Sequence, residues 1–145
     1  GCVGEFPSEH VILTGGEPTL QLTAPLLGQL KRAGKIVHIE TNGTVRLADD
    51  VAAHIDWITV SPKFGMIPEI QRIDELKVVF DMNHTDHIDR LAGVRATDDQ
   101  CYYLQPCDRN DAVYNERNLA ACIDYIRRNP RWKLSLQLHK LLGIR

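Results

Sequence analysis

Five short clusters of polar residues in this sequence carry the groups that small-ligand chemistry needs. Each directly follows a short apolar run: Thr14-Gly15-Gly16-Glu17-Pro18, Glu40-Thr41-Asn42-Gly43, Ser61-Pro62-Lys63, Leu104-Gln105-Pro106-Cys107-Asp108 and Gln137-Leu138-His139-Lys140. Paired glycines let backbone amides approach a ligand closely, and carboxylate, amide and hydroxyl groups donate or accept hydrogen bonds. If the fold brings the clusters together, they predict a binding site for a small polar molecule.

The first two clusters suit an amino-acid-like ligand. Gly15 and Gly16 allow close backbone approach, and the Glu17 carboxylate is an acceptor for an ammonium group. Glu40 adds an acceptor, and Asn42 adds both a donor and an acceptor. A tight strand-to-helix turn alone would also explain paired glycines, so the argument depends on all five clusters together.

The later clusters add other donors and acceptors. Ser61 and Lys63 can donate to carboxylate or hydroxyl groups, while Gln105 and Asp108 can fix a ribose or an amino group. His139 follows an apolar run, where a neutral imidazole donates or accepts. Five such clusters on one edge are better explained by one binding site than by five unrelated turns.

Alternating strands and helices would place the clusters on one edge. Apolar runs predict six strands, over residues 9–14, 35–40, 57–60, 73–80, 102–104 and 134–138. The first run is expected to be a strand buried on both faces. Helical spacing and caps predict helices between Thr23 and Gly34, over 47–55 and 85–92, and between Asn115 and Asn129. Right-handed crossovers bring the carboxyl ends of parallel strands together.

The element pattern predicts a single α/β domain over residues 1–145 with a mainly parallel six-stranded sheet. Six strands are too few for a closed eight-stranded barrel, so an open or partial barrel is expected. A doubly wound sheet with helices on both faces is the alternative and has the same functional edge.

Composition excludes several classes of protein. The chain has 145 residues, 43% of them hydrophobic, and a net charge of -2, which argues against a general binder of nucleic acid or anionic membrane. No apolar window approaches the roughly 18 residues of a membrane span, and no signal pattern is present, so a cytoplasmic protein is expected. Cysteine spacing fits no paired metal motif, and Cys122 is expected in the core. His10, His38 and His54 show no paired ligand spacing.

Six sequence motifs, in this order, restrict the families to which the chain could belong: VILTGGEPTLQ, HIETNGT, WITVSPK, DELKVVF, YYLQPCD and SLQLHKLLGIR. As a set they resemble the 7-carboxy-7-deazaguanine synthase family of the radical S-adenosylmethionine superfamily. Two alternatives stay open. One is an enzyme similar to glycyl-radical activases, which shares GGEP, and the other is a non-catalytic binding domain of the same fold.

The resemblance implies a partial (β/α) barrel, S-adenosylmethionine, a [4Fe-4S] cluster and Mg²⁺. The implied reaction is that of a carbon-nitrogen lyase in queuosine and deazapurine biosynthesis: radical contraction of 6-carboxy-5,6,7,8-tetrahydropterin to 7-carboxy-7-deazaguanine, with loss of ammonia. It further implies a cytoplasmic homodimer and an external one-electron reductant such as flavodoxin.

The resemblance also assigns roles to individual residues. The implied S-adenosylmethionine contacts are Gly15, Gly16, Glu17, Glu40, Asn42, Ser61, Pro62, Lys63, Gln105, Pro106, Cys107 and Asp108. Among these, the turn at Gly16 would hold the methionine amino end, and 105–108 would lie beside the nucleoside. The implied pterin contacts are Thr14, His139 and Arg145.

The sequence departs from the superfamily at the cluster ligands. The superfamily holds its cluster with three grouped cysteines before the GGEP strand, whereas only Cys2 precedes Gly15 here. We therefore expect no cluster or Mg²⁺ ligand in this chain, and we expect the family's first βα element to be missing. By itself the chain is not expected to turn over substrate.

Overall fold

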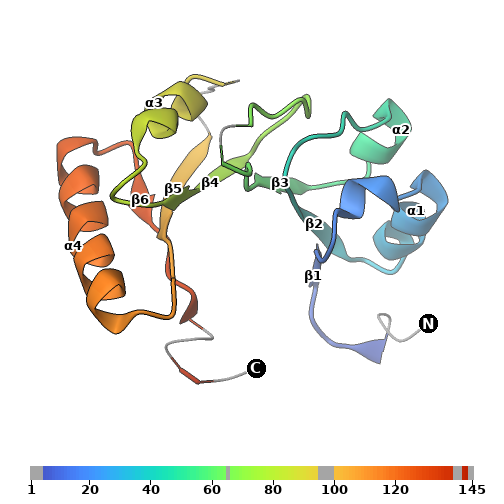
Figure 1. Cartoon of the computed structure of the whole chain (residues 1–145). Coiled ribbons are helices and arrows are strands. Elements are labelled where there is room, and N and C mark those ends of the chain that lie inside the picture. Colours follow the sequence, from blue (N-terminus) through green and yellow to red (C-terminus); the bar gives the residue numbers. More distant parts are fainter. Residues whose placement is uncertain (1–4, 65, 95–99, 139–141, 144–145) are drawn as a thin grey trace. The chain divides into compact units, whose positions relative to one another are not determined.

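A computed structural model describes residues 5–64, 66–94, 100–138 and 142–143 (Figure 1). Its strands are β1 (His10–Leu13), β2 (Ile36–Thr41), β3 (Trp57–Val60), β4 (Glu75–Phe80), β5 (Cys101–Pro106) and β6 (Lys133–Leu134). Its helices are the 3-10 turn η2 (Pro18–Leu20) and α1 (Ala24–Arg32), α2 (Asp49–Ala52), α3 (Asp86–Ala92) and α4 (Ala112–Arg128). None of these helices is long and apolar enough to span a membrane.

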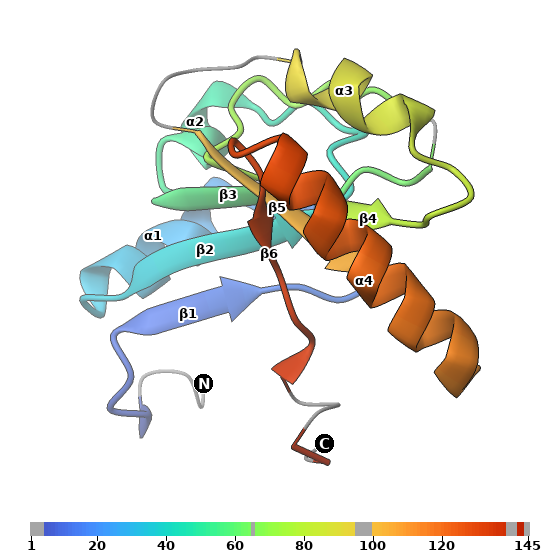
Figure 2. The same ribbon diagram turned by 90° about the vertical axis from the view of Figure 1, so that its left-hand side faces the viewer.

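The strands lie in one six-stranded sheet in chain order, from β1 to β6. The pairs β1–β2, β2–β3 and β5–β6 are parallel, and Figure 2 shows β1 and β2 running in the same direction. The predicted α/β fold with a parallel six-stranded sheet is therefore confirmed. A doubly wound sheet would reverse its strand order at a switch point. The unbroken order shows that this alternative is wrong.

The chain divides into two compact units, Gly1–Glu75 and Leu76–Arg145. The expectation of a single domain stays a prediction. In the first unit, β2 alternates between buried Val37 and Ile39 on one face and half-buried His38 and Glu40 on the other. Fully buried Leu27 of α1 belongs to the same core, and α1 contacts β2. One face of this sheet is thus packed against helices, and the other carries polar side chains.

The first strand is less buried than its apolar sequence predicts. Ile12 is 60% exposed, and Val11 and Leu13 are only half-buried. Since β1 is the edge strand and Ile12 shares the face that carries His38, the prediction of burial on both faces is wrong. A continuous apolar run indicates a strand, but it does not distinguish an edge strand from a central one.

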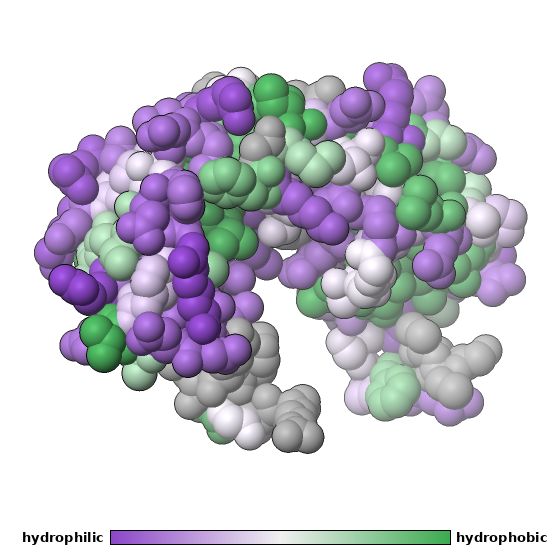
Figure 3. All heavy atoms as spheres, in the orientation of Figure 1, coloured by the Kyte–Doolittle hydropathy of each residue, from purple (hydrophilic) through white to green (hydrophobic). Residues whose placement is uncertain are grey.

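In the second unit, α4 packs on β5 and β6, with Cys122 and Leu104 fully buried between them. The exposed surface of α4 is mostly hydrophilic (Figure 3). The predicted cap at Asn115 is wrong, because the helix begins one turn earlier and Asp111 caps it by accepting from the Tyr114 amide at 3.0 Å. Asn129 ends the helix as predicted.

The last strand is shorter than predicted. The β5–β6 pairing covers Lys133 and Leu134, and the Ser135 amide still donates to Leu104 O at 2.8 Å. Beyond that point Leu136 and Leu138 are 44% and 61% exposed, so the predicted strand over 134–138 is wrong in its second half. Alternating leucines alone do not guarantee a partner strand along their full length.

Candidate functional site

The carboxylate of Glu17 holds the turn that follows β1. Glu17 Oε1 accepts from the Thr19 hydroxyl at 2.6 Å, from the Thr19 amide at 3.2 Å and from the Thr41 hydroxyl at 2.5 Å. Glu17 Oε2 accepts from the Asn42 amide at 2.9 Å. We call Glu17, Thr19, Thr41 and Asn42 the Glu17 bracket. It ties the turn after β1 to the end of β2.

These hydrogen bonds keep Glu17 ionised. Burial is the largest single influence and raises the pKa of its carboxyl, but the donors Thr19, Thr41 and Asn42 together outweigh burial, so the net pKa is lowered. A carboxylate has about four lone-pair positions, and Glu17 accepts four hydrogen bonds from this chain. Three of these bonds reach Oε1, which leaves that oxygen no position for a further donor, whereas Oε2 accepts from the Asn42 amide.

The side chains of Thr41 and Asn42 fix the turn after β2 by hydrogen bonds with the two residues that follow. The Thr41 hydroxyl accepts from the Gly43 amide at 3.0 Å, and Asn42 Oδ1 accepts from the Thr44 amide at 2.9 Å and its hydroxyl at 2.6 Å. Gly43 has φ +78°, and a Cβ there would lie 2.7 Å from Val60 Cγ1. The turn at residues 40–44 is therefore fixed by its own hydrogen bonds, and its fourth position requires glycine because any side chain there would clash with Val60.

The turn at Gly15 and Gly16 is open on its outer side. Their φ angles are +90° and +58°, and a Cβ at either position would meet nothing within 4 Å. Thr14 and both glycines are exposed. Hydrogen bonds from Thr41 and Asn42 to Glu17 therefore fix the turn to the end of β2, and the backbone at the two glycines stays accessible to a ligand.

The third cluster continues the β2–β3 pairing. The Ser61 amide donates to Thr41 O at 2.8 Å, which sets this cluster beside the Glu17 bracket. Pro62 is buried, whereas Lys63 is exposed. The first unit thus brings together the turn at Gly16, Asn42 and Ser61 at the carboxyl ends of β1, β2 and β3.

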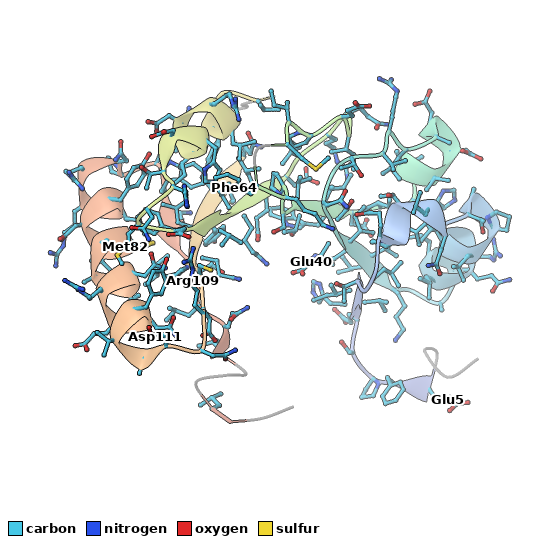
Figure 4. The ribbon with its side chains drawn as sticks, in the orientation of Figure 1. Glu5, Glu40, Phe64, Met82, Arg109 and Asp111 are labelled. Atoms are coloured by element: carbon cyan, nitrogen blue, oxygen red, sulfur yellow. The ribbon has the colours of Figure 1, made fainter. Side chains whose placement is uncertain are left out.

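Glu40 belongs to a different surface of the first unit. It points away from α1 and α2 (Figure 4) and lines a hollow of about 410 Å³ on the polar face of the sheet. The other lining residues are Ile12, His38, Trp57, Thr59 and Glu75. Since Thr41 faces the opposite side of β2, Glu40 and the Glu17 bracket are separated by the sheet.

Two histidines on this polar face form a pair that sequence reasoning missed. His10 Nδ1 lies 2.9 Å from His38 Nε2, and one of the two nitrogens donates. The residues are 28 apart in sequence, so spacing along one element gives no signal. Once the register places Ile12 opposite His38, the pair follows from the strand geometry.

The second unit contains a pocket of about 170 Å³ at the carboxyl end of β5. Its lining residues are Gln105, Pro106, Cys107, Asp108, Asn115, Leu119, Ser135, Leu136 and Gln137. All four predicted contact residues at 105–108 therefore share one concave surface. Its mixture of apolar walls and a few polar groups is typical of a small-molecule site.

Two asparagines of α4 hold the loop that forms this pocket. Asn118 is fully buried, and its Nδ2 donates to Phe80 O at 3.0 Å and to Cys107 O at 3.2 Å, while its Oδ1 accepts from the Met82 amide at 2.8 Å. Asn115 Nδ2 donates to Asp108 Oδ1 at 2.8 Å. Sequence reasoning treated Asn115 as a cap and missed Asn118, because a buried asparagine in a helical stripe resembles any other polar residue.

Asp81 fixes the other end of this loop. It is 8% exposed, pairs with Arg109 and accepts from the Tyr114 hydroxyl at 2.6 Å. Burial is the largest influence on Asp81 and raises the pKa of its carboxyl, but bonds from Tyr114 and Asn83 and the charge of Arg109 lower it overall. Burial and the bond to Asp81 raise the pKa of Tyr114 to about 12. Figure 4 shows Arg109 on the same side of the unit as Met82 and Asp111.

Two predicted substrate residues, His139 and Arg145, lie outside the described residues. Over the part of the chain that the structure describes, no group of three or more His, Cys, Asp or Glu side chains could hold a metal ion. Each unit by itself offers groups for a small polar ligand: the open turn at Gly16 in the first unit and the pocket at 105–108 in the second.

Comparison with known proteins identifies the family. No family model matches the chain. A 7-carboxy-7-deazaguanine synthase from Bacteroides thetaiotaomicron is 42% identical over 143 residues, which cover 99% of this chain and 69% of that protein. The chain belongs to the 7-carboxy-7-deazaguanine synthase family. A member from Bradyrhizobium diazoefficiens is 39% identical over 140 residues, covering 95% of this chain and 60% of its own length.

A solved structure agrees with this family. The crystal structure of QueE from Escherichia coli matches with a TM-score of 0.69 and 28% identity, over 92% of this chain and 58% of that one. The chain thus spans about three fifths to two thirds of the length of these 7-carboxy-7-deazaguanine synthases.

Proposed function

We propose that this chain is the part of a 7-carboxy-7-deazaguanine synthase that binds S-adenosylmethionine and contributes to pterin binding. The reaction would be the radical contraction of 6-carboxy-5,6,7,8-tetrahydropterin to 7-carboxy-7-deazaguanine with loss of ammonia. The observation that carries the proposal is the structure of the turn at Gly15 and Gly16, which is open to a ligand and braced by Glu17. Family membership supports S-adenosylmethionine as the ligand of this turn.

Each unit has its own role in this proposal. In the first unit, the backbone at Gly16 and the cluster Ser61–Lys63 would contact the methionine part of the cofactor, and Thr14 would face the pterin. In the second unit, Gln105–Asp108 would contact the nucleoside part. The 170 Å³ pocket and its apolar walls suit an adenine ring, while Gln105 and Asp108 can bond to hydroxyl or amino groups.

When bound and reduced, S-adenosylmethionine supplies a 5′-deoxyadenosyl radical that starts the reaction by removing a hydrogen atom. The residues described here bind and orient the reactants. No set of metal ligands occurs among residues 5–64, 66–94, 100–138 and 142–143, so we assign no step of the [4Fe-4S] cluster or of Mg²⁺ to them. Glu40, in the hollow on the polar face, would bind a reactant.

The remaining family properties are part of the same proposal: a cytoplasmic homodimer, a radical lyase class, and a one-electron reductant such as flavodoxin. The single domain over 1–145 is also proposed. The relatives named as 7-carboxy-7-deazaguanine synthases argue against an enzyme of the glycyl-radical activase kind.

The test uses the full-length protein, reconstituted anaerobically with iron and sulfide. With S-adenosylmethionine, Mg²⁺, a reductant and 6-carboxy-5,6,7,8-tetrahydropterin, we expect 7-carboxy-7-deazaguanine and ammonia, measured by mass spectrometry. Omitting each component in turn is the control. Binding of S-adenosylmethionine without product would favour the non-catalytic alternative, and cofactor cleavage without pterin conversion would indicate a different substrate.

A further inference from the structure

We propose that Glu17 is a positioning residue, which holds the turn at Gly16 in place for S-adenosylmethionine without itself contacting the cofactor's ammonium group. The inference rests on the proposed function, since it concerns how the methionine end is held. It differs from the simplest interpretation of the sequence, in which the Glu17 carboxylate accepts directly from the ligand.

The first observation is that donors of the protein already engage the Glu17 carboxylate and fully occupy its Oε1. Three donors from Thr19 and Thr41 reach Oε1, and the Asn42 amide reaches Oε2. A ligand ammonium group could bond to Oε1 only by displacing one of these donors, and Oε2 is directed at the Asn42 amide at the end of β2. The Thr41 hydroxyl among them is buried, where an unpaired polar group is costly.

The second observation is that Thr41 extends the bracket to the next turn. Thr41 is 3% exposed, and its hydroxyl donates to Glu17 Oε1 while accepting from the Gly43 amide. A hydroxyl has one hydrogen, so its donation to Glu17 fixes its direction. Glu17, Thr41 and Gly43 therefore form one connected chain of hydrogen bonds between the turns after β1 and β2.

The third observation is that the ligand-accessible part of the turn is backbone. Thr14, Gly15 and Gly16 are exposed, and the space beside both glycines is empty to at least 4 Å. Glu17 is only half-exposed, and its oxygens are directed at β2. Cofactor affinity would then depend on how well the bracket fixes this backbone.

The two roles predict different behaviour for Thr41. If Glu17 acts through the bracket, Thr41→Val should weaken S-adenosylmethionine binding about as much as Glu17→Gln, by roughly tenfold, because each removes a bond to a charged group. The double variant should then bind within about twofold of the weaker single variant, since both act through the same structure. If Glu17 contacts the cofactor directly, only Glu17→Gln should weaken binding.

The experiment is equilibrium dialysis of S-adenosylmethionine against the full-length, cluster-reconstituted protein. Thr41→Ser keeps the hydroxyl and should bind within about twofold of wild type. Thr23→Val is the matched control, because Thr23 is exposed and makes no side-chain capping bond. Normal affinity in Thr41→Val together with a loss in Glu17→Gln would overturn the proposal. If Glu17→Gln does not fold, equal affinities of Thr41→Val and Thr41→Ser for S-adenosylmethionine would overturn the proposal.

Amide hydrogen exchange separates this proposal from the proposed function. In the ligand-free full-length protein, the Asn42 and Gly43 amides should exchange faster in Thr41→Val than in wild type, by roughly tenfold. If the Asn42 and Gly43 amides exchange at the same rate in both proteins, Thr41 does not hold the turn, and the positioning role of Glu17 is rejected whether or not the cofactor binds. A wild-type protein that fails to bind S-adenosylmethionine while Thr41→Val shows faster exchange would reject the proposed function and leave a structural bracket without a cofactor role.

Discussion

Asp56 closes the amino end of β2 by exchanging two hydrogen bonds with Val37. Its Oδ2 accepts from the Val37 amide at 2.7 Å, and its own amide donates to Val37 O at 2.8 Å. Asp74 does the same at β3, where its Oδ2 accepts from the Ile58 amide at 2.7 Å and its amide donates to Ile58 O at 3.0 Å. Each aspartate directly precedes one strand and pairs with the second residue of the neighbouring strand, which fixes the register of the two strands.

Replacing Asp56 with alanine should lower the free energy of unfolding by about 1–3 kcal/mol, because the amide of buried Val37 loses its acceptor. Asp56→Asn is the matched control. It keeps an oxygen for Val37 and loses mainly the ion pair with Lys31, whose side chain is 36% exposed, so it should cost less than about 1 kcal/mol. Urea unfolding followed by circular dichroism measures both, and equal costs would show that the amide bond is not the stabilising contact.

The same residue predicts a pH dependence. The Lys31 hydrogen bond, followed by the Val37 amide, lowers the pKa of Asp56. A carboxyl with a lowered folded pKa stabilises the fold fully above its unfolded value, about 3.9, and the contribution is lost as pH falls through the folded pKa. The stability difference between wild type and Asp56→Asn should therefore shrink below about pH 4. A constant difference from pH 7 to pH 3 would contradict this assignment.

Lys35 should hold the segment before β1. It is 8% exposed, and its Nζ donates to Phe6 O at 2.8 Å and to Ser8 O at 2.7 Å. Lys35→Met leaves both carbonyls unpaired and should cost about 1–3 kcal/mol, with faster amide exchange in β1. Lys133→Met, an exposed lysine of β6, should leave exchange in β1 unchanged. Equal protection of β1 in both variants would show that Lys35 is not its anchor.

The fold was largely predictable because its signals are local. The run before Thr14 and the stripe around Cys122 depend on residues close in sequence, and the strand and helix that they predict both occur. Thr23 stands at the start of α1 as predicted, but its side chain makes no capping hydrogen bond. The misjudged details depend on distant partners. Exposure of Ile12 follows from its edge position, and the short β6 follows from where its pairing with Leu104 ends.

The sequence predicted which polar residues gather at the candidate site, but it did not predict which of them face a ligand and which hold the turns. Polar residues after strands marked Glu17, Asn42 and Gln105, which the structure places in turns and a pocket. Thr41 was included in its cluster without a role and Asn118 was not marked, because a buried hydroxyl or amide becomes informative only when its partners are known. Sequence showed where polar groups gather, but only the hydrogen bonds distinguish those that face a ligand from those that hold the turns.

Two cysteines should react differently with iodoacetamide. Cys122 is fully buried and burial raises the pKa of its thiol to about 12, so it should stay unlabelled until the protein unfolds. Cys107 lines the 170 Å³ pocket and is partly exposed, so it should be labelled in the native protein. S-Adenosylmethionine and 5′-methylthioadenosine should both slow this labelling in the full-length protein, measured by peptide mass spectrometry. Equal rates with and without either ligand would argue against a nucleoside in this pocket.

Gly43→Ala should be more damaging than Gly34→Ala, although both glycines have positive φ. A Cβ at Gly43 would lie 2.7 Å from Val60 Cγ1 and 3.0 Å from Pro68 Cβ, whereas one at Gly34 would meet nothing within 4 Å. Gly34→Ala should therefore cost only the left-handed conformation, about 1–2 kcal/mol. Gly43→Ala should cost about 1–3 kcal/mol more, because it also crowds packed side chains. Adding Val60→Ala should recover part of that extra cost, and equal losses in the two glycine variants would show that the turn after β2 yields without strain.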